Sequence, residues 1–160
     1  MTHEELLRIL RYIPWTGKFH WAVPRPKVRV GAEAGYVDKK GYVVIELGGR
    51  AYFAHRLAWF YQMGEWPPKQ IDHIDRNKSN NVFSNLRIAT NGQNQANAPH
   101  RNKTGFKGVN YHAWVRDRPY EAKITANKKV VYLGSYATAE EAHAAYCEAA
   151  KRIHGEFFHP

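Results

Sequence analysis

The sequence of 160 residues contains one cysteine, Cys147. A lone cysteine excludes a disulfide within the chain and any zinc site built from several cysteines. Long apolar runs are also missing, since no stretch approaches the ~20 residues that a membrane-spanning helix needs. The N-terminal residues, Met1 to Glu5, lack the basic start of a secretory signal peptide. These absences predict a soluble protein that acts in the cytoplasm and has no membrane partner.

Acidic residues are scarce relative to basic ones. The sequence has 24 Lys and Arg against 14 Asp and Glu, a formal net charge of +10. This surplus of positive charge favours a polyanionic partner, with nucleic acid as the first candidate. Scattered solvated lysines would give the same charge without such a partner. The apolar fraction of 44% is ample for a packed core, which argues against global disorder.

Hydrophobic patterning predicts an α+β fold that begins with a β-rich region of unclear role over residues 1–50. Thr2 and Glu5 have the spacing of a helix-capping box, and apolar residues at helical spacing extend this first helix to Pro14. The elements expected next are a strand at 17–21, a hairpin of runs 41–47 and 50–54 around Gly48-Gly49, and a helix at 55–63.

The C-terminal part of the sequence predicts a small sheet covered by one helix. Three β-prone runs occur at 108–111, 120–125 and 130–133. An amphipathic helix follows, with Thr138 and Glu141 as its capping box and Gly155 as its end. Because its apolar stripe is mostly alanine, this helix can lie close against the sheet. A separate domain is therefore expected over residues 104–160.

Chemically distinctive residues lie in the middle of the chain. Asp72 and His73 stand together at the end of a short apolar run, and an Asn-rich loop leads to Asn85 and a second apolar run. Asn94 follows on a short helix predicted at 90–97. An imidazole near its ordinary pKa can deprotonate water, and carboxylate and amide oxygens are ligands that Mg²⁺ accepts. Together these groups supply what phosphodiester hydrolysis requires.

Residues 54–98 resemble the HNH endonucleases, also called His-Me finger or ββα-metal nucleases. The residues that carry the resemblance are Asp72-His73, Asn80-Asn81, Asn85-Leu86, Asn94 and the upstream run His55-Arg56-Leu57-Ala58-Trp59. The resemblance implies a nuclease finger over residues 51–100. It implies His73 as the general base, and Asn85 as the residue that ties the loop so that His73 points correctly.

The resemblance further implies Asp72 and Asn94 as the ligands of one Mg²⁺ or Mn²⁺ ion. The last residue of the family motif is His or Asn, and Asn94 at this position resembles the homing-endonuclease branch. Each residue alone has an ordinary alternative, because Asp72 can cap a turn and His73 or Asn85 can be purely structural. Asp75 is expected to be a loop residue and not a ligand. His55 is expected either to touch phosphate or to pack.

Residues 104–158 resemble an AP2 (ERF-type) DNA-binding domain. The resemblance is carried by runs at 105–109, 120–124, 132–136, 138–142 and 144–146. It implies that an exposed sheet face enters the major groove of DNA. The DNA-facing residues that it implies are Lys107, Asn110, His112, Trp114, Lys123, Thr125 and Tyr132. None of these positions holds arginine, and Arg116 and Arg118 lie in the turn between them, which favours phosphate contacts of modest specificity. The alternative is a small αβ interaction domain with Tyr120 and Tyr146 in its core.

These observations together predict a metal-dependent DNA endonuclease of the phage or homing type. It would hydrolyse phosphodiester bonds in double-stranded DNA, as a monomer or homodimer, and would be encoded by a phage or mobile element acting in a bacterial host. One alternative is a non-catalytic, sequence-specific DNA-binding regulator with an inactive finger. Another is a protein that binds or cleaves RNA.

Overall fold

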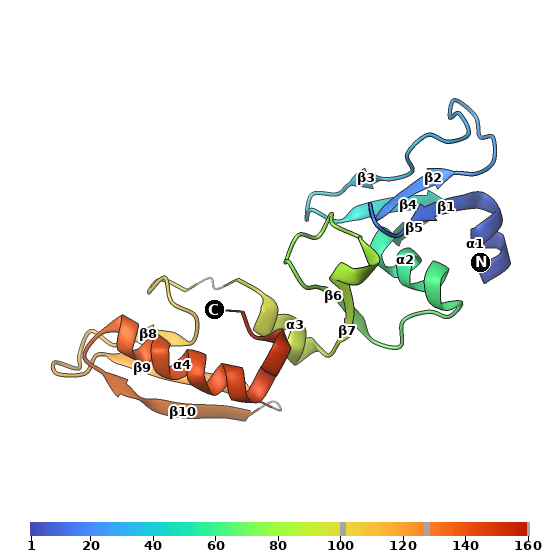
Figure 1. The fold of residues 1–160 in the computed structure, drawn as a ribbon. Coiled ribbons are helices and arrows are strands. Elements are labelled where there is room, and N and C mark those ends of the chain that lie inside the picture. The colour runs from blue at the N-terminus through green and yellow to red at the C-terminus, as the bar shows by residue number, and fades with distance from the viewer. Residues whose placement is uncertain (100–101, 127–128, 160) are drawn as a thin grey trace. The chain divides into compact units, whose positions relative to one another are not determined.

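The structure is a computed structural model that describes residues 1–99, 102–126 and 129–159. The chain forms two compact units, Met1–Ala89 and Thr90–Pro160 (Figure 1). Helices and several small antiparallel sheets make up both units, which agrees with the predicted α+β class. The domain boundary predicted at residue 100 lies outside the described residues.

The elements follow one another along the chain as Figure 1 labels them. In the first unit they are α1 (His3–Ile9), β1 (Leu10–Ile13), β2 (Lys18–Trp21), β3 (Tyr36–Val37), β4 (Val43–Leu47), β5 (Arg50–Phe53), α2 (Ala54–Met63), β6 (Gln70–His73), η1 (Phe83–Asn85) and β7 (Leu86–Ala89). In the second unit they are α3 (Asn91–Asn97), β8 (Val109–Tyr111), β9 (Tyr120–Ala126), β10 (Lys129–Tyr136), α4 (Ala139–His154) and η2 (Gly155–Phe157).

The first helix is shorter than the sequence predicts. Thr2 and Glu5 form both hydrogen bonds of the capping box, but α1 ends at Ile9 and the chain continues as β1. The prediction of one helix to Pro14 was wrong because the residues beyond Ile9 follow a two-residue period. Leu10 and Tyr12 are buried on one face of β1, which pairs antiparallel with β2. Burial that alternates from one residue to the next is typical of a strand with one face packed on a core.

The predicted hairpin and the helix after it are confirmed. β4 and β5 pair antiparallel with Leu47 opposite Arg50. Gly48 and Gly49 between them have φ of 56° and 76°, the positive values that a tight hairpin turn requires. α2 follows directly and ends at Gly64, which adopts the left-handed conformation.

One hydrophobic core fills the first unit. Leu6 of α1, Phe19 of β2, Ile45 of β4 and Leu57 of α2 are almost fully buried in it. Ile71 of β6 and Leu86 of β7 belong to the same cluster. The β6–β7 hairpin, which carries Asp72 and His73, is therefore anchored in the rigid part of the unit.

The second unit is a three-stranded antiparallel sheet of order β10-β9-β8, packed against α4. Ala142 and Ala150 of α4 are fully buried, so the alanine stripe brings the helix close to the sheet as predicted. Gly108 has φ of 75°, and a Cβ at this position would overlap the ring of Tyr146. None of the helices in the described residues is long and apolar enough to cross a bilayer.

Candidate active site

Asp72 and His73 are the last two residues of β6, and both are buried, with 4% and 5% of their surface exposed. β6 pairs antiparallel with β7, which places Asp72 opposite Arg87 and His73 opposite Leu86. Buried ionisable side chains need partners, because an uncompensated charge or polar group away from water is costly. The structure supplies a separate partner for each of the two side chains.

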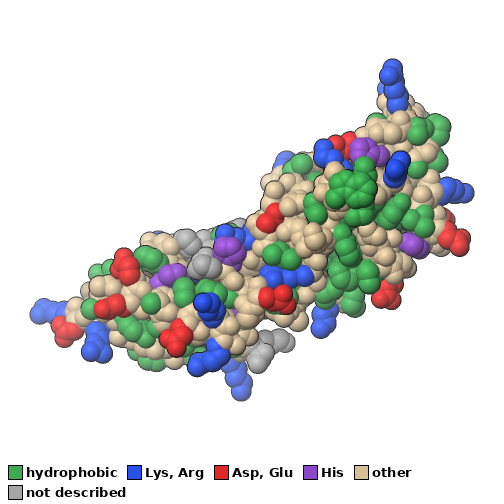
Figure 2. All heavy atoms as spheres, viewed as in Figure 1, with side chains coloured by type: hydrophobic (Ala, Val, Ile, Leu, Met, Phe, Trp, Pro, Cys, Tyr) green, Lys and Arg blue, Asp and Glu red, His purple; other side chains and the backbone are tan. Residues whose placement is uncertain are grey.

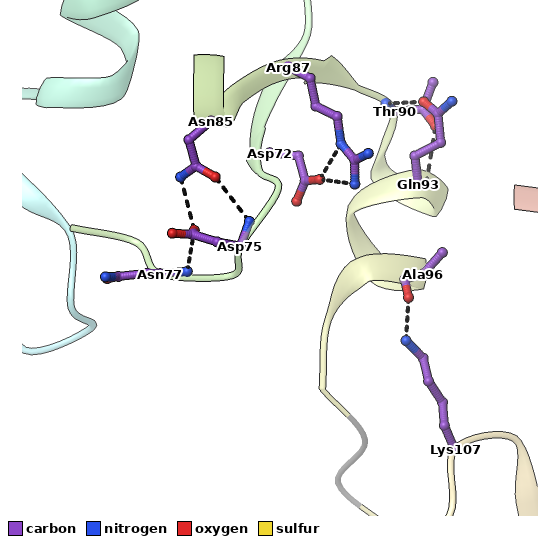
Figure 3. Close-up of polar contacts among 9 residues, drawn as sticks. All are labelled: Asp72, Asp75, Asn77, Asn85, Arg87, Thr90, Gln93, Ala96 and Lys107. Atoms are coloured by element: carbon purple, nitrogen blue, oxygen red, sulfur yellow. Dashed lines mark hydrogen bonds and ion pairs between the residues drawn. The ribbon is translucent and has the colours of Figure 1, made fainter. Parts of the chain in front are cut away.

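Arg87 is the partner of Asp72. Its Nε and Nη2 atoms each lie 2.8 Å from Oδ2 of Asp72, and the pair is drawn in Figure 3. The Arg87 side chain is itself only 13% exposed, so this ion pair is shielded from solvent. The guanidinium therefore holds a carboxylate in place at a buried position, beside the histidine.

Asn81 is the partner of His73. His73 Nε2 lies 3.1 Å from Oδ1 of Asn81, and Asn81 Nδ2 donates to the carbonyl of Ser79 at 3.3 Å. The bond to Ser79 identifies Nδ2 as the amide nitrogen of Asn81, so the atom that faces His73 is the oxygen Oδ1. An oxygen can only accept, and Nε2 of His73 therefore carries the hydrogen. In the neutral imidazole the lone pair is then on Nδ1, the atom that can accept a proton.

Burial lowers the pKa of His73 below its ordinary value, although the hydrogen bond to Asn81 and the charges of Asp75 and Asp72 oppose the shift. The imidazole is therefore neutral near pH ~7, where a group with the ordinary pKa would be partly charged. A neutral imidazole with its lone pair on Nδ1 is the form required of a general base.

Aromatic rings enclose His73 on the side of α2. The ring of His55 stands nearly perpendicular to that of His73, with the centroids 5.1 Å apart, and Tyr42 lies 6.3 Å away. Burial, followed by the proximity of His73 and Arg56, lowers the pKa of His55 to about 3. Of the two roles expected for His55, the structure shows packing, as a neutral ring stacked on Phe53.

Asn85 joins both sides of the loop that follows His73 (Figure 3). Its Oδ1 accepts from the backbone N–H of Asp75 at 3.0 Å, and its Nδ2 donates to Asp75 Oδ1 at 2.9 Å and to the carbonyl of Asn80 at 2.8 Å. Burial would raise the pKa of Asp75, but hydrogen bonds from Asn80, Asn85 and the backbone of Asn77 outweigh it and lower the pKa. Asp75 thus makes the contacts of a loop residue.

Asn94 lies on α3, in the second unit. Thr90 caps this helix and forms a capping box with Gln93, shown in Figure 3. Asp72, His73 and Asn85 belong to the first unit. In the described part of the chain no group of three His, Cys, Asp or Glu side chains could hold a metal. Asp72 and Asn94 each carry an oxygen donor of the kind that Mg²⁺ accepts.

The residues predicted to face DNA lie in the second unit. Lys123 and Thr125 are exposed on β9 while Ala122 and Ile124 between them are buried, and Trp114 is 79% exposed. Tyr132 is also exposed. Of the residues expected in the core, Tyr146 is buried and Tyr120 is partly so.

Glu121 is an acidic residue among these candidates that the sequence analysis did not single out. Its carboxylate lies 3.3 Å from Lys123 Nζ, 3.5 Å from His112 Nε2 and 3.4 Å from Asn110 Nδ2. Lys107 makes a different contact, because its Nζ donates to the carbonyls of Ala96 and, at 2.6 Å, Ala98. This amino group therefore neutralises the C-terminal end of α3, where carbonyls lack helical partners.

Comparison with known proteins identifies the segment that contains the β6–β7 hairpin. Residues 52–96 match the HNH endonuclease family. A protein of Acanthamoeba polyphaga mimivirus, named as an uncharacterized HNH endonuclease, is 32% identical over 127 residues. That match covers 78% of this chain and 65% of the viral protein, so the chain spans slightly less than two thirds of its relative's length. The HNH segment, residues 52–96, includes Asp72, His73, Asn85 and Asn94.

Proposed function

We propose that the protein is a metal-dependent DNA endonuclease that hydrolyses phosphodiester bonds, with His73 as its general base. The observation that carries the proposal is the state of His73 within the HNH segment. It is buried, and its Nε2 lies 3.1 Å from the amide oxygen of Asn81. An oxygen at this place requires the hydrogen on Nε2, which leaves the lone pair of the neutral ring on Nδ1. An imidazole held in this way accepts the proton of an attacking water at Nδ1.

The neighbouring residues support this role. Arg87 holds the carboxylate of Asp72, and Asn85 closes the loop that follows His73. In this proposal Asp72 and Asn94 hold one Mg²⁺ or Mn²⁺ ion. The bound ion would neutralise charge on the phosphate and stabilise the leaving 3′ oxygen.

Double-stranded DNA is the proposed substrate, and the second unit is proposed to bind it in the manner of an AP2 domain. The net charge of +10 suits a polyanion, and Lys and Arg side chains are spread over both units in the view of Figure 2. A groove of about 920 Å³ in the second unit is lined by both apolar and polar side chains, and the polar ones include Asn91, Gln93, Gln95, Asn110, Lys123 and Thr125. These polar groups can contact a nucleic-acid backbone.

We further propose that the enzyme belongs to the phage or homing type and is encoded by a mobile element; its relative in Acanthamoeba polyphaga mimivirus is encoded by a virus. One HNH segment per chain suits nicking by a monomer, and a homodimer would cut both strands.

Cleavage of supercoiled plasmid tests the proposal. We expect nicked or linear product with Mg²⁺ or Mn²⁺ and none with EDTA. His73→Ala should lower the rate by about 10²-fold or more, the contribution of a general base, and leave DNA binding unchanged. His3→Ala is the control, since His3 lies in α1 and its ring bonds to the carbonyl of Tyr61 instead.

Added imidazole should restore part of the activity of the His73→Ala protein, because a small base can enter the space left by the side chain. Restoration would separate a chemical role from a structural one. Tight DNA binding by the unaltered protein without metal-dependent cleavage of plasmid or phage DNA would refute the proposal and favour a regulator. Cleavage of RNA in preference to duplex DNA would refute the proposal that double-stranded DNA is the substrate.

A further inference from the structure

The N-terminal hairpin β1–β2 contacts the loop that holds His73. The hydroxyl of Tyr12, on β1, donates a hydrogen bond of 2.7 Å to the backbone carbonyl of Asn81, a residue 69 positions away in the sequence. Tyr12 is only 5% exposed. Burial raises the pKa of Tyr12 far above its ordinary value, so the hydroxyl keeps its proton and stays a donor.

The turn of the same hairpin lies directly against the loop. Gly17 has φ of 70°, and a Cβ at this position would overlap the backbone of Asn81 and Val82. On the other side, Phe83 N–H donates to the carbonyl of Pro14 at 3.1 Å. The backbone from the Asn81 carbonyl to Phe83 is thus fixed by residues of the hairpin.

Asn81 connects this contact to the candidate general base. It is 1% exposed, its main chain is held by Tyr12 and its side-chain Oδ1 accepts from His73 Nε2. A displacement of the Asn81 backbone therefore displaces the acceptor that fixes the His73 ring. The hairpin is itself rigid, because Leu10 and Phe19 anchor it in the core.

We propose that the β1–β2 hairpin is a positioning element of the active site, in which Tyr12 and Gly17 fix Asn81 and thereby the orientation and tautomer of His73. The catalytic part of this inference rests on the proposed nuclease function. Tyr12 and Gly17 are positioning residues, since they act only through Asn81. A reacting group displaced by about 1 Å can lose on the order of 10² in rate, so a contact of this kind affects turnover without touching DNA.

Tyr12→Phe is the informative change, because it removes one hydroxyl and keeps the ring in the core. Tyr36→Phe is its matched control, since this tyrosine is exposed and bonds to Glu46 instead. The first readout is the ¹⁵N spectrum of the His73 ring in the metal-free protein. We expect the Nε2–H tautomer in the unaltered chain and in Tyr36→Phe, and a mixture of tautomers in Tyr12→Phe.

The second readout is the split between kcat and KM in plasmid cleavage. We expect kcat to fall about 10-fold in Tyr12→Phe with KM unchanged. Asn81→Ala should cost at least as much, and adding Tyr12→Phe to it should cost nothing more, because both changes break one chain of contacts.

A purely structural role for Tyr12 gives a different result. Thermal unfolding would then show a lower midpoint, while the His73 ring signals and kcat, measured well below that midpoint, would match those of Tyr36→Phe. That outcome overturns the inference. If the unaltered protein cleaves nothing, the proposed function fails, yet the ring signals still decide whether the hairpin sets the His73 tautomer.

Discussion

Acid should destabilise the first unit through His55. This side chain is 7% exposed, and its Nδ1 has no hydrogen-bond partner among the described residues. Burial, with smaller effects of His73 and Arg56, lowers its pKa to about 3, whereas an unfolded histidine has a pKa of about 6.5. Between these two values the unfolded chain binds a proton that the folded chain does not. The contribution of His55 to stability is therefore complete above pH ~6.5 and is lost as the pH falls toward ~3.

The size of the effect follows from the two pKa values of His55. Below pH ~6.5 the free energy of unfolding falls by about 1.4 kcal/mol for each pH unit. Between about pH 7 and about pH 5 the loss from His55 is then about 2 kcal/mol. That is a substantial part of the stability of an ordinary domain, about 5–15 kcal/mol.

Urea unfolding followed by tryptophan fluorescence measures this loss. Four of the five tryptophans lie in the first unit, and Trp114→Phe removes the one in the second unit. His55→Phe is the comparison, because phenylalanine keeps a ring beside Phe53 and Tyr42 and does not titrate. Other groups titrate in both proteins, so the difference between them isolates His55. Equal losses of stability in the two proteins between about pH 7 and about pH 5 would refute the reasoning.

Two further predictions concern charge. Arg87→Met leaves the carboxylate of Asp72 buried without its cation and should lower the stability of the first unit by about 3 kcal/mol. Saturating Mg²⁺ should raise the thermal midpoint more in this variant than in the unaltered protein, and equal shifts would contradict a cation at Asp72. Glu121→Gln removes a negative charge beside Lys123 and should tighten DNA binding and steepen its salt dependence by about one unit of log–log slope, by fluorescence anisotropy. Glu140→Gln, on the exposed first turn of α4, should change neither, and equal gains would contradict a role for the Glu121 face.

Elements defined by local signals could be predicted from the sequence. The capping boxes predicted at Thr2 and Thr138 both form, because their partners lie within three residues. Thr90 forms a third capping box that was not predicted. The end of α1 could not be predicted in the same way. Leu10 satisfies helical spacing with Leu6, but its pairing with Trp21 across the β1–β2 hairpin decides its conformation, and packing of this kind overrides a weak local preference.

In the candidate site too, residues that are close in the sequence could be predicted and contacts between distant residues could not. Asp72 and His73 could be found because they are adjacent in the sequence and follow an apolar run. The pairing of Asp72 with Arg87 could have been found from the register of the β6–β7 hairpin, since the two residues lie opposite each other. The contact from Tyr12 to Asn81 has no local signal, because 69 residues separate the partners and only the fold brings them together.

The contact between Tyr12 and Asn81 bears on how much of the chain would have to be transferred for the proposed site to be kept intact. The family match begins at residue 52, forty positions after Tyr12. A fragment cut at that boundary would carry Asp72 and His73 but would lose the donor to Asn81 and the Leu10 and Phe19 core beneath the hairpin. If Tyr12 positions the site as proposed, recombination that preserves a working site would have to join the chains upstream of Tyr12, and the inherited block would be longer than residues 52–96.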